Sequence, residues 1–330
     1  MTDFALRGAA IEAEAAPSRA RVLRRLRLGD AVFRVLTRSA ALAVLVLLGG
    51  VILSLISGSL PALQAFGLEF VTTEIWNPVT EKFGALAPVY GTLITSFIAM
   101  LIAVPVGLLV AFFLTELCPM ILRRPIGIAI ELLAGIPSII YGIWGLFVFA
   151  PFLQQTLQPF LISTFGNVPV LSTLFAGPPY GIGTLTAGLI LAIMVLPFIT
   201  SISRDVFDAV PPVLKEAAYG VGCTTWEVFR YVVLPYTRVG VIGGVMLGLG
   251  RALGETMAVT FVIGNAHKIS ASILHPGTTI SASIANEFTE AVGDLYTSAL
   301  IALGLILFVI TFFVLAIARY MLLRIERKIG

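Results

Sequence analysis

Charge is scarce in this sequence, and the shortage excludes a soluble globular protein. Only 12% of the 330 residues are charged, whereas 58% are hydrophobic; soluble domains carry about 25% charged residues. The apolar runs are long enough for helices, which need about 20 residues to cross a bilayer. They lack the residue-by-residue alternation of a membrane β-barrel. The composition therefore predicts an all-α polytopic membrane protein.

Cysteine and histidine are equally rare. The chain has two cysteines, Cys118 and Cys223, and two histidines, His267 and His275. Both cysteines fall near predicted cytoplasmic ends of membrane spans, where thiols stay reduced and a disulfide is not expected. Both histidines fall in one predicted outer loop, without the clustered ligands of a zinc site. We predict neither a disulfide nor a bound metal.

The sequence also lacks a nucleotide-binding loop. A Walker A loop ends in Gly-Lys-Ser/Thr, and none of the four lysines follows a glycine. No soluble catalytic domain and no repeat of fixed period are present. The chain is therefore predicted to be no enzyme and to bind neither ATP nor Mg²⁺ itself, and we expect no nucleic-acid partner.

Six apolar runs predict six transmembrane helices with both termini in the cytoplasm. They cover residues 39–56, 90–117, 126–149, 181–201, 237–264 and 296–318. Of the 21 lysines and arginines, this placement leaves only Lys82 and Lys268 outside and Arg251 in the membrane, as the positive-inside rule requires. The first run resembles a signal-peptide core but exceeds the usual length of about 7–15 residues, so we interpret it as an uncleaved span.

Two regions differ in composition. Residues 1–35 are polar and basic and predict a cytoplasmic N-terminal tail, either a basic helix on the inner membrane surface or a solvated segment that sets topology. Residues 36–330 form the predicted transmembrane domain. Within it, the uncharged, proline-rich residues 150–180 suggest an outer loop that rests partly on the membrane.

The long inner segment 203–236 carries a motif of fixed spacing. Its members are Glu216, Ala217, Ala218, Gly222, Leu234 and Pro235. Pro211 and Pro212 favour the start of a short helix, the glycines at 220 and 222 favour its end, and Thr224 or Thr225 can cap a second helix. The pattern predicts a helical hook whose small alanines permit close docking and whose glutamate supplies a charge.

Arg251 draws attention because a charge inside a membrane is unfavourable. Each residue of a helix advances by about 100°, which places Arg251 and Glu255 on one face with the glycines at 240, 244 and 248. Arg251 lies roughly 21 Å into its span, where a charge costs about 2.5–3.5 kcal/mol. The pair is either a salt bridge that fixes packing or an anion site, because a guanidinium matches oxyanion geometry. Glu131 is either a buried network member or an inner-rim residue.

Three stretches carry a family resemblance. Residues 248–259 read Gly-Leu-Gly-Arg-Ala-Leu-Gly-Glu-Thr-Met-Ala-Val, residues 134–142 read Ala-Gly-Ile-Pro-Ser-Ile-Ile-Tyr-Gly, and residues 214–220 read Leu-Lys-Glu-Ala-Ala-Tyr-Gly. With the hook motif, they resemble the permease subunits of phosphate-specific ABC importers over about residues 85–325. The resemblance implies a type I ABC importer permease fold (MetI-like) in a bacterial inner membrane, with Arg251, Glu255 and Glu131 along the substrate pathway.

The resemblance also implies partners. A second permease (PstA-like) would complete the pathway for inorganic phosphate, and a phosphate-binding protein (PstS-like) would deliver substrate from outside. An ABC ATPase dimer (PstB-like) would bind ATP and Mg²⁺ and receive the coupling loop 203–236. The chain itself would sit in the lipid bilayer and bind no cofactor.

Other functions stay open at this point. A related permease could carry another oxyanion, such as sulfate or molybdate. An ion-driven secondary carrier is a different class, and it predicts inverted repeats that the sequence does not contain. A membrane sensor that influences phosphate signalling without transport is a third class.

Overall fold

The computed structural model describes the backbone of residues 2–326 and the side chains of residues 26, 27 and 29–324. The chain divides into two compact units, residues 1–57 and 58–330. From Thr2 on, the first unit lies within one long helix, α1 (Thr2–Phe66). Most charges of the predicted basic tail fall among residues 1–25, whose side chains lie outside the described residues.

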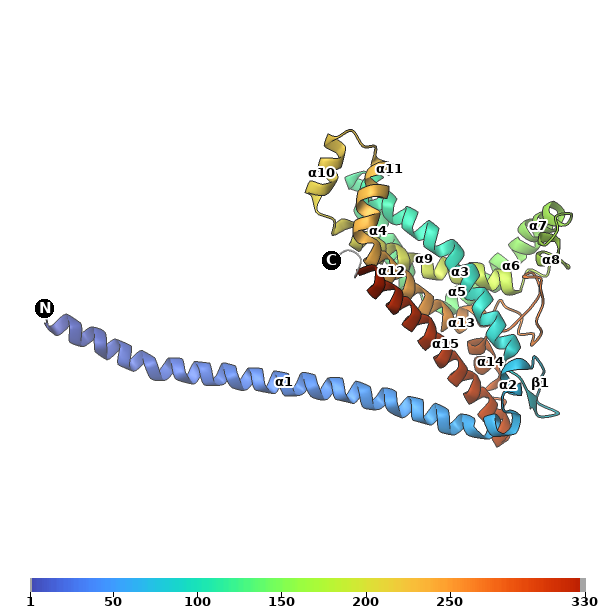
Figure 1. The fold of residues 1–330 in the computed structure, drawn as a ribbon, viewed down its shortest axis with the longest axis horizontal. Helices are drawn as coiled ribbons and strands as arrows, with labels where there is room; N and C mark the ends of the chain where they lie inside the picture. Colours follow the sequence, from blue (N-terminus) through green and yellow to red (C-terminus); the bar gives the residue numbers. More distant parts are fainter. Residues whose placement is uncertain (1, 327–330) are drawn as a thin grey trace. The chain divides into compact units, whose positions relative to one another are not determined.

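Six helices among the described residues are long and apolar enough to cross a membrane, the number that the sequence predicts. They are Gly29–Phe66, Leu86–Leu117, Ser138–Phe165, Thr184–Asp208, Thr225–Leu253 and Asp294–Arg324. Within the second unit, the principal helices are α3 (Leu86–Phe112), α9 (Thr184–Asp208), α12 (Leu234–Leu253) and α15 (Asp294–Glu326) (Figure 1).

The third span is displaced from its predicted position. A break at residues 135–137 separates α4 (Met120–Ala134) from the spanning helix, which starts only at Ser138. Pro137 causes the break, because a proline N-caps the second helix and disfavours helical backbone before it. The predicted outer loop from residue 150 is therefore helical up to Phe165, and the lack of charge there suits a span as well as a loop. Its segments are α5 (Ser138–Trp144), η2 (Gly145–Phe149), α6 (Ala150–Phe152), η3 (Leu153–Leu157) and α7 (Gln158–Phe165).

Helix α9 is the centre of the second unit. It is largely buried and packs against α3, α12 and α4. Glycines make the close approach possible: a Cβ atom at Gly188 would lie 2.6 Å from Ile98 of α3, and one at Gly244 would lie 2.8 Å from Ile202 of α9. Small residues let helix backbones come together in a membrane. Val195 and Ile199 of α9 belong to the buried hydrophobic core at these helix contacts.

One end of the second unit, which we call the hook end, carries the predicted hook. Its two helices are α10 (Pro212–Gly220) and α11 (Thr225–Val228), followed by the π-helical turn η4 (Phe229–Val233) that leads into α12. Pro212 starts α10, Gly222 has a φ of 92° after its end, and Thr224 forms a capping box with Glu227. The prediction of two short helices, the second capped by a threonine, is confirmed. Another π-helical turn, η1 (Phe113–Leu117), ends α3 beside them.

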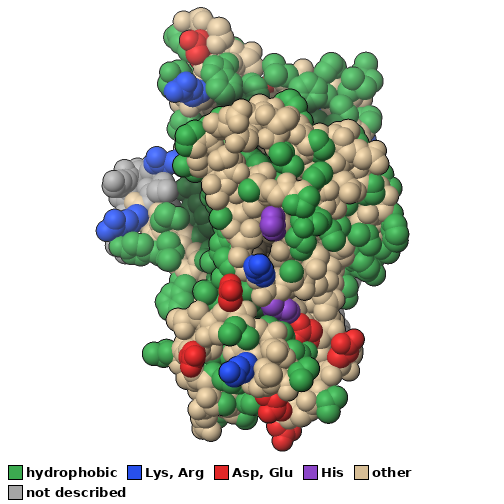
Figure 2. Space-filling model, turned by 90° about the vertical axis from the view of Figure 1, so that its right-hand side faces the viewer, with side chains coloured by type: hydrophobic (Ala, Val, Ile, Leu, Met, Phe, Trp, Pro, Cys, Tyr) green, Lys and Arg blue, Asp and Glu red, His purple; other side chains and the backbone are tan. Residues whose placement is uncertain are grey.

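The opposite end, which we call the hairpin end, consists of short elements. They are α2 (Glu69–Thr72), β1 (Trp76–Asn77), β2 (Lys82–Phe83), α8 (Leu171–Leu174) and α14 (Ile280–Glu287). Helix α13 (Met257–Thr260) lies further inside, where Ala258 and Val259 join the buried core. The strands pair antiparallel, with Trp76 opposite Phe83. Figure 2 shows that acidic side chains gather toward one end of this side of the molecule, while much of the remainder is uncharged. The exposed acids of the hairpin end are Glu69, Glu74, Glu81, Glu290 and Asp294.

Candidate functional site

The helix that carries Arg251 ends two residues after it. Helix α12 stops at Leu253, and the Gly254 N–H donates to the carbonyls of Ala252 and Gly250. Glu255 therefore lies in the break between α12 and α13, outside the helix. The predicted fifth span, which continued to residue 264, is therefore too long. The prediction that Glu255 shares a helical face with Arg251 is also wrong, because the helix ends before Glu255. Glycine weakens a helix and is favoured where one ends, which explains the break.

Arg251 and Glu255 make different contacts. The Arg251 side chain is exposed, forms no ion pair with any described residue, and interacts electrostatically with Tyr141 of α5. Glu255 accepts a hydrogen bond from the Ala258 N–H at 3.3 Å, so its carboxylate caps the first turn of α13. A carboxylate at a helix N-terminus is favourable. The structure thus brings the two residues near one break without pairing them, and it leaves the guanidinium accessible.

The glycine face of α12 is closed by another helix. A Cβ atom at Gly240 would lie 2.7 Å from Val206, and one at Gly248 would lie 3.0 Å from Ile199, both in α9. This face serves helix packing, as the small-residue spacing predicts. Arg251 follows at the end of the same helix, where α9 no longer covers the side chain.

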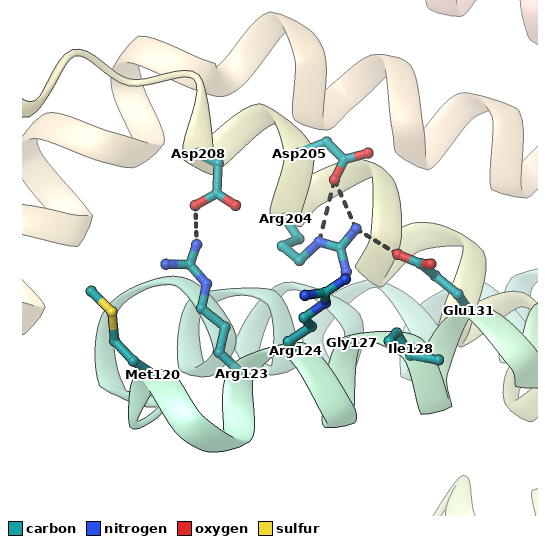
Figure 3. Close-up of a pocket in the computed structure, with 9 residues that line it drawn as sticks. All are labelled: Met120, Arg123, Arg124, Gly127, Ile128, Glu131, Arg204, Asp205 and Asp208. Atoms are coloured by element: carbon teal, nitrogen blue, oxygen red, sulfur yellow. Dashed lines mark hydrogen bonds and ion pairs between the residues drawn. The ribbon is translucent and has the colours of Figure 1, made fainter.

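Glu131 lies apart from this break, at the hook end. Its Oε1 pairs with Nη2 of Arg204 at 2.7 Å, and its side chain is half exposed. Arg204 also binds Asp205 at 3.0 Å, and Arg123 pairs with Asp208. These groups surround a hollow of about 370 Å³ between α4 and α9 (Figure 3). Glu131 is thus a member of an ion-pair network, as one of the two predicted roles has it, but the network is accessible to solvent rather than buried.

The motif residues of the hook form a largely accessible surface. Glu216, Ala217, Gly222 and Pro235 are exposed, while Ala218 and Leu234 are half-buried. Beside them, Val213 and Val221 expose 71% and 81% of their surface. Such apolar exposure on a short helix suits a contact with another chain.

The sequence did not reveal a partly buried ion pair behind the hook. Lys215 Nζ lies 2.6 Å from Oε1 of Glu116, and the side chains are only 18% and 9% exposed. A single acidic residue at the end of a long apolar run was the available signal. The partner could not be read from the sequence, because 99 positions separate the two residues.

At the hairpin end, Glu287 joins three segments. Its carboxylate accepts hydrogen bonds from the Trp76 indole and, at 2.8 Å, from the Tyr296 hydroxyl, and it lies 3.4 Å from Nε2 of His267. Burial raises the pKa of Glu287 and lowers the pKa of His267 to about 4. The His267 ring stacks on Trp76 at a centroid distance of 5.1 Å. Across the described residues, no three histidine, cysteine, aspartate or glutamate side chains come together as metal ligands.

Solved structures share the fold. The chain superposes on a bacterial ABC transporter involved in the import of the acidic polysaccharide alginate with a TM-score of 0.55, at 18% identity, over 84% of this chain and 95% of the other. An inward-facing structure of the MetNI methionine ABC transporter gives a TM-score of 0.50 at 17% identity, over 73% and 94% of the two chains. The fold is that of a type I ABC importer permease.

The family follows from the sequence match. Residues 103–327 match the family described as binding-protein-dependent transport system inner membrane component, and the chain belongs to this family of membrane permeases rather than to an enzyme family. Three relatives are each named a phosphate transport system permease protein PstC, the third as probable. The relative from Mesorhizobium japonicum is 72% identical over 95% of this chain and 96% of its own length. Those from Pasteurella multocida and Methanocaldococcus jannaschii are 58% and 38% identical, over 91% and 88% of this chain and 94% and 93% of theirs.

Proposed function

We propose that this chain is the PstC-type permease subunit of an ATP-driven phosphate importer. The observation that carries the proposal is the identity of 72% along nearly the whole chain with a relative named for phosphate transport. The guanidinium of Arg251 supports it, because it is exposed, has no ion-pair partner in the described part of the chain, and offers the donor fork that suits a tetrahedral oxyanion.

Arg251 binds the phosphate oxygens in this proposal. The side chain projects from the last turn of α12, next to the break before α13, and can donate two parallel hydrogen bonds to one anion. Glu255 keeps the break in shape through its bond to the Ala258 N–H and can accept a hydrogen bond from a protonated phosphate. Glu131 acts at the inner rim through its bond to Arg204.

The hook end is the cytoplasmic end, and both termini lie on that side. A PstB-like ATPase dimer, which binds ATP and Mg²⁺, docks on the exposed surface around Glu216, Ala217 and Val213. A PstA-like permease completes the pathway, and a PstS-like binding protein delivers phosphate to the hairpin end. The exposed alanine and apolar side chains of α10 and the basic groups of the hook end support this orientation.

The test is ATP-dependent uptake of radiolabelled phosphate into proteoliposomes that contain this chain and its three partners. Arg251→Gln should lower uptake about 10- to 100-fold, because hydrogen bonds to a charged group contribute about 1.5–3 kcal/mol. Arg324→Gln is the matched control, since Arg324 lies over the Tyr320 ring near the end of α15 and should leave uptake unchanged.

Two results would contradict the proposal. Normal uptake by Arg251→Gln would remove Arg251 from the pathway. Uptake that sulfate or molybdate suppresses at equal concentration would favour a permease for another oxyanion, since a guanidinium alone does not distinguish tetrahedral anions.

A further inference from the structure

Helix α10 of the hook is held to the rest of the chain by very few contacts. None of its nine residues is buried, and Ala218 alone packs partly against the apolar cluster beneath. The cross-element backbone hydrogen bonds of residues 212–223 run within the hook, as from Cys223 N–H to the Ala218 carbonyl. Among the described residues, its one polar tie to another element is the ion pair between Lys215 and Glu116.

This ion pair is short and shielded from water. Lys215 Nζ and Glu116 Oε1 are 2.6 Å apart, and the two side chains are 18% and 9% exposed. The other ion pairs at the hook end are more open, since Asp208 and Glu131 expose 44% and 50% of their side chains. A shielded pair tolerates loss of one partner poorly, because the remaining charge is still largely removed from water and has no compensating partner.

The pair connects the hook to the end of helix α3. Lys215 directly precedes Glu216, the exposed charge of the hook motif. Glu116 lies in η1, the π-helical turn that ends α3, where the Thr115 hydroxyl donates to the carbonyls of Ala111 and Phe112. Such turns are locally irregular and occur frequently at functional positions. Helix α3 then runs along α9, so a displacement at Glu116 reaches the core of the second unit.

We propose that Lys215 and Glu116 are positioning residues that transmit movement of the hook into α3. The inference rests on the proposed function, because it assumes that an ATPase moves the hook. Pulling α10 shifts Lys215, the ion pair carries Glu116 with it, and η1 passes the displacement to α3. Without the pair, α10 follows the ATPase while α3 stays behind, so ATP hydrolysis continues without transport.

The experiment uses the reconstituted importer with Lys215→Glu, Glu116→Lys and the double swap. Each single change should lower phosphate uptake about 10-fold, the order expected for loss of a shielded charge pair, while ATP hydrolysis stays within about 2-fold of the unsubstituted importer. The double swap should restore most of the uptake, because it re-forms the pair with opposite polarity. Lys215→Met should uncouple as the single changes do, whereas Arg324→Met, at an exposed arginine near the end of α15, should not.

A second measurement does not depend on the substrate. Spin labels at the exposed positions Leu101 in α3 and Phe312 in α15 report the distance between these helices. In the unsubstituted importer, ATP with vanadate should change this distance, and each single variant should abolish the change. If the unsubstituted importer takes up no phosphate but its helices still move, the proposed substrate fails and the inference stands.

Three results would overturn the inference. The first is a double swap that fails to restore uptake or helix movement. The second is a single variant that keeps both. The third is a single variant whose ATPase no longer co-purifies, because the pair would then hold the docking surface in shape and transmit nothing.

Discussion

At the scale of single residues, the burial of His267 and Glu287 makes the hairpin end sensitive to pH. Burial lowers the pKa of His267 from 6.5 to about 4, so the folded chain keeps the ring neutral where the unfolded chain binds a proton. The stability that this provides is present above pH 6.5 and is lost as the pH falls towards 4. Burial raises the pKa of Glu287, which acts in the opposite direction: the folded carboxyl keeps its proton to higher pH.

The first prediction concerns these opposing signs. His267→Gln should abolish the loss of stability between pH 6.5 and 4, which amounts to at most about 3 kcal/mol in the free energy of unfolding. The variant keeps Glu287, whose raised pKa favours the folded chain at low pH, so its free energy of unfolding should increase on acidification. Thermal unfolding in detergent, followed by the fluorescence of the three tryptophans, measures the effect. Equal pH profiles for the variant and the unsubstituted chain would contradict it.

The residues themselves were partly predictable. Arg251 stood out in the sequence because it is a lone charge in an apolar run, and it is accessible in the structure. The predicted pairing of Arg251 with Glu255 is absent from the structure, because the helix ends at Leu253 and Glu255 accepts a hydrogen bond from the Ala258 N–H instead. The roles of Arg251, Glu255 and Glu131 in transport stay predictions.

At the scale of elements, the packing of α12 on α9 depends on which glycine faces the neighbour. A Cβ atom at Gly244 would lie 2.8 Å from Ile202, whereas one at the adjacent Gly243 would meet no atom within 4 Å. The two positions share one helix and one residue type, and they differ only in the side of the helix on which they lie.

The second prediction uses this matched pair. Gly244→Val should lower the melting temperature of the purified chain and destabilise it by about 1–3 kcal/mol, the range for overpacked cores. Gly243→Val should be neutral or slightly stabilising, since glycine is about 1 kcal/mol worse than alanine inside a helix. Equal melting temperatures for the two variants would show that α12 does not pack on α9 through this face.

Some elements could be predicted from the sequence and others could not. The two hook helices and their cap at Thr224 followed from local residue preferences and are present. The third span was placed 12 residues too early, because the uncharged segment after residue 150 has the composition of both a loop and a span. The helix break at residues 135–137 separates α4 as an extra helix, which packs on α9.

At the scale of the whole molecule, the proposed orientation puts both native cysteines in the cytoplasm. Cys223 lies in the hook, and Cys118 follows η1 at the same end. Both thiols are free and partly exposed. Val292, with 86% of its surface exposed, lies between α14 and α15 at the hairpin end.

The third prediction tests this orientation. A membrane-impermeant maleimide should leave the native chain unlabelled in intact spheroplasts and label it in inverted membrane vesicles. A Val292→Cys variant is the control and should be labelled in intact spheroplasts. Labelling of the native cysteines in intact spheroplasts would reverse the proposed orientation and place the hook away from any cytoplasmic ATPase.

The sequence by itself determined that the chain crosses a membrane six times and carries a hook between its fourth and fifth spans. This was possible because a span satisfies its own backbone hydrogen bonds and is therefore a property of local composition. Only the tertiary structure decided that Lys215 meets Glu116, that Arg204 meets Glu131, and that Arg251 has no ion-pair partner among the residues that the structure describes. Those contacts depend on which helices lie side by side, and no local pattern records the partner of a charge 73 or 99 positions away.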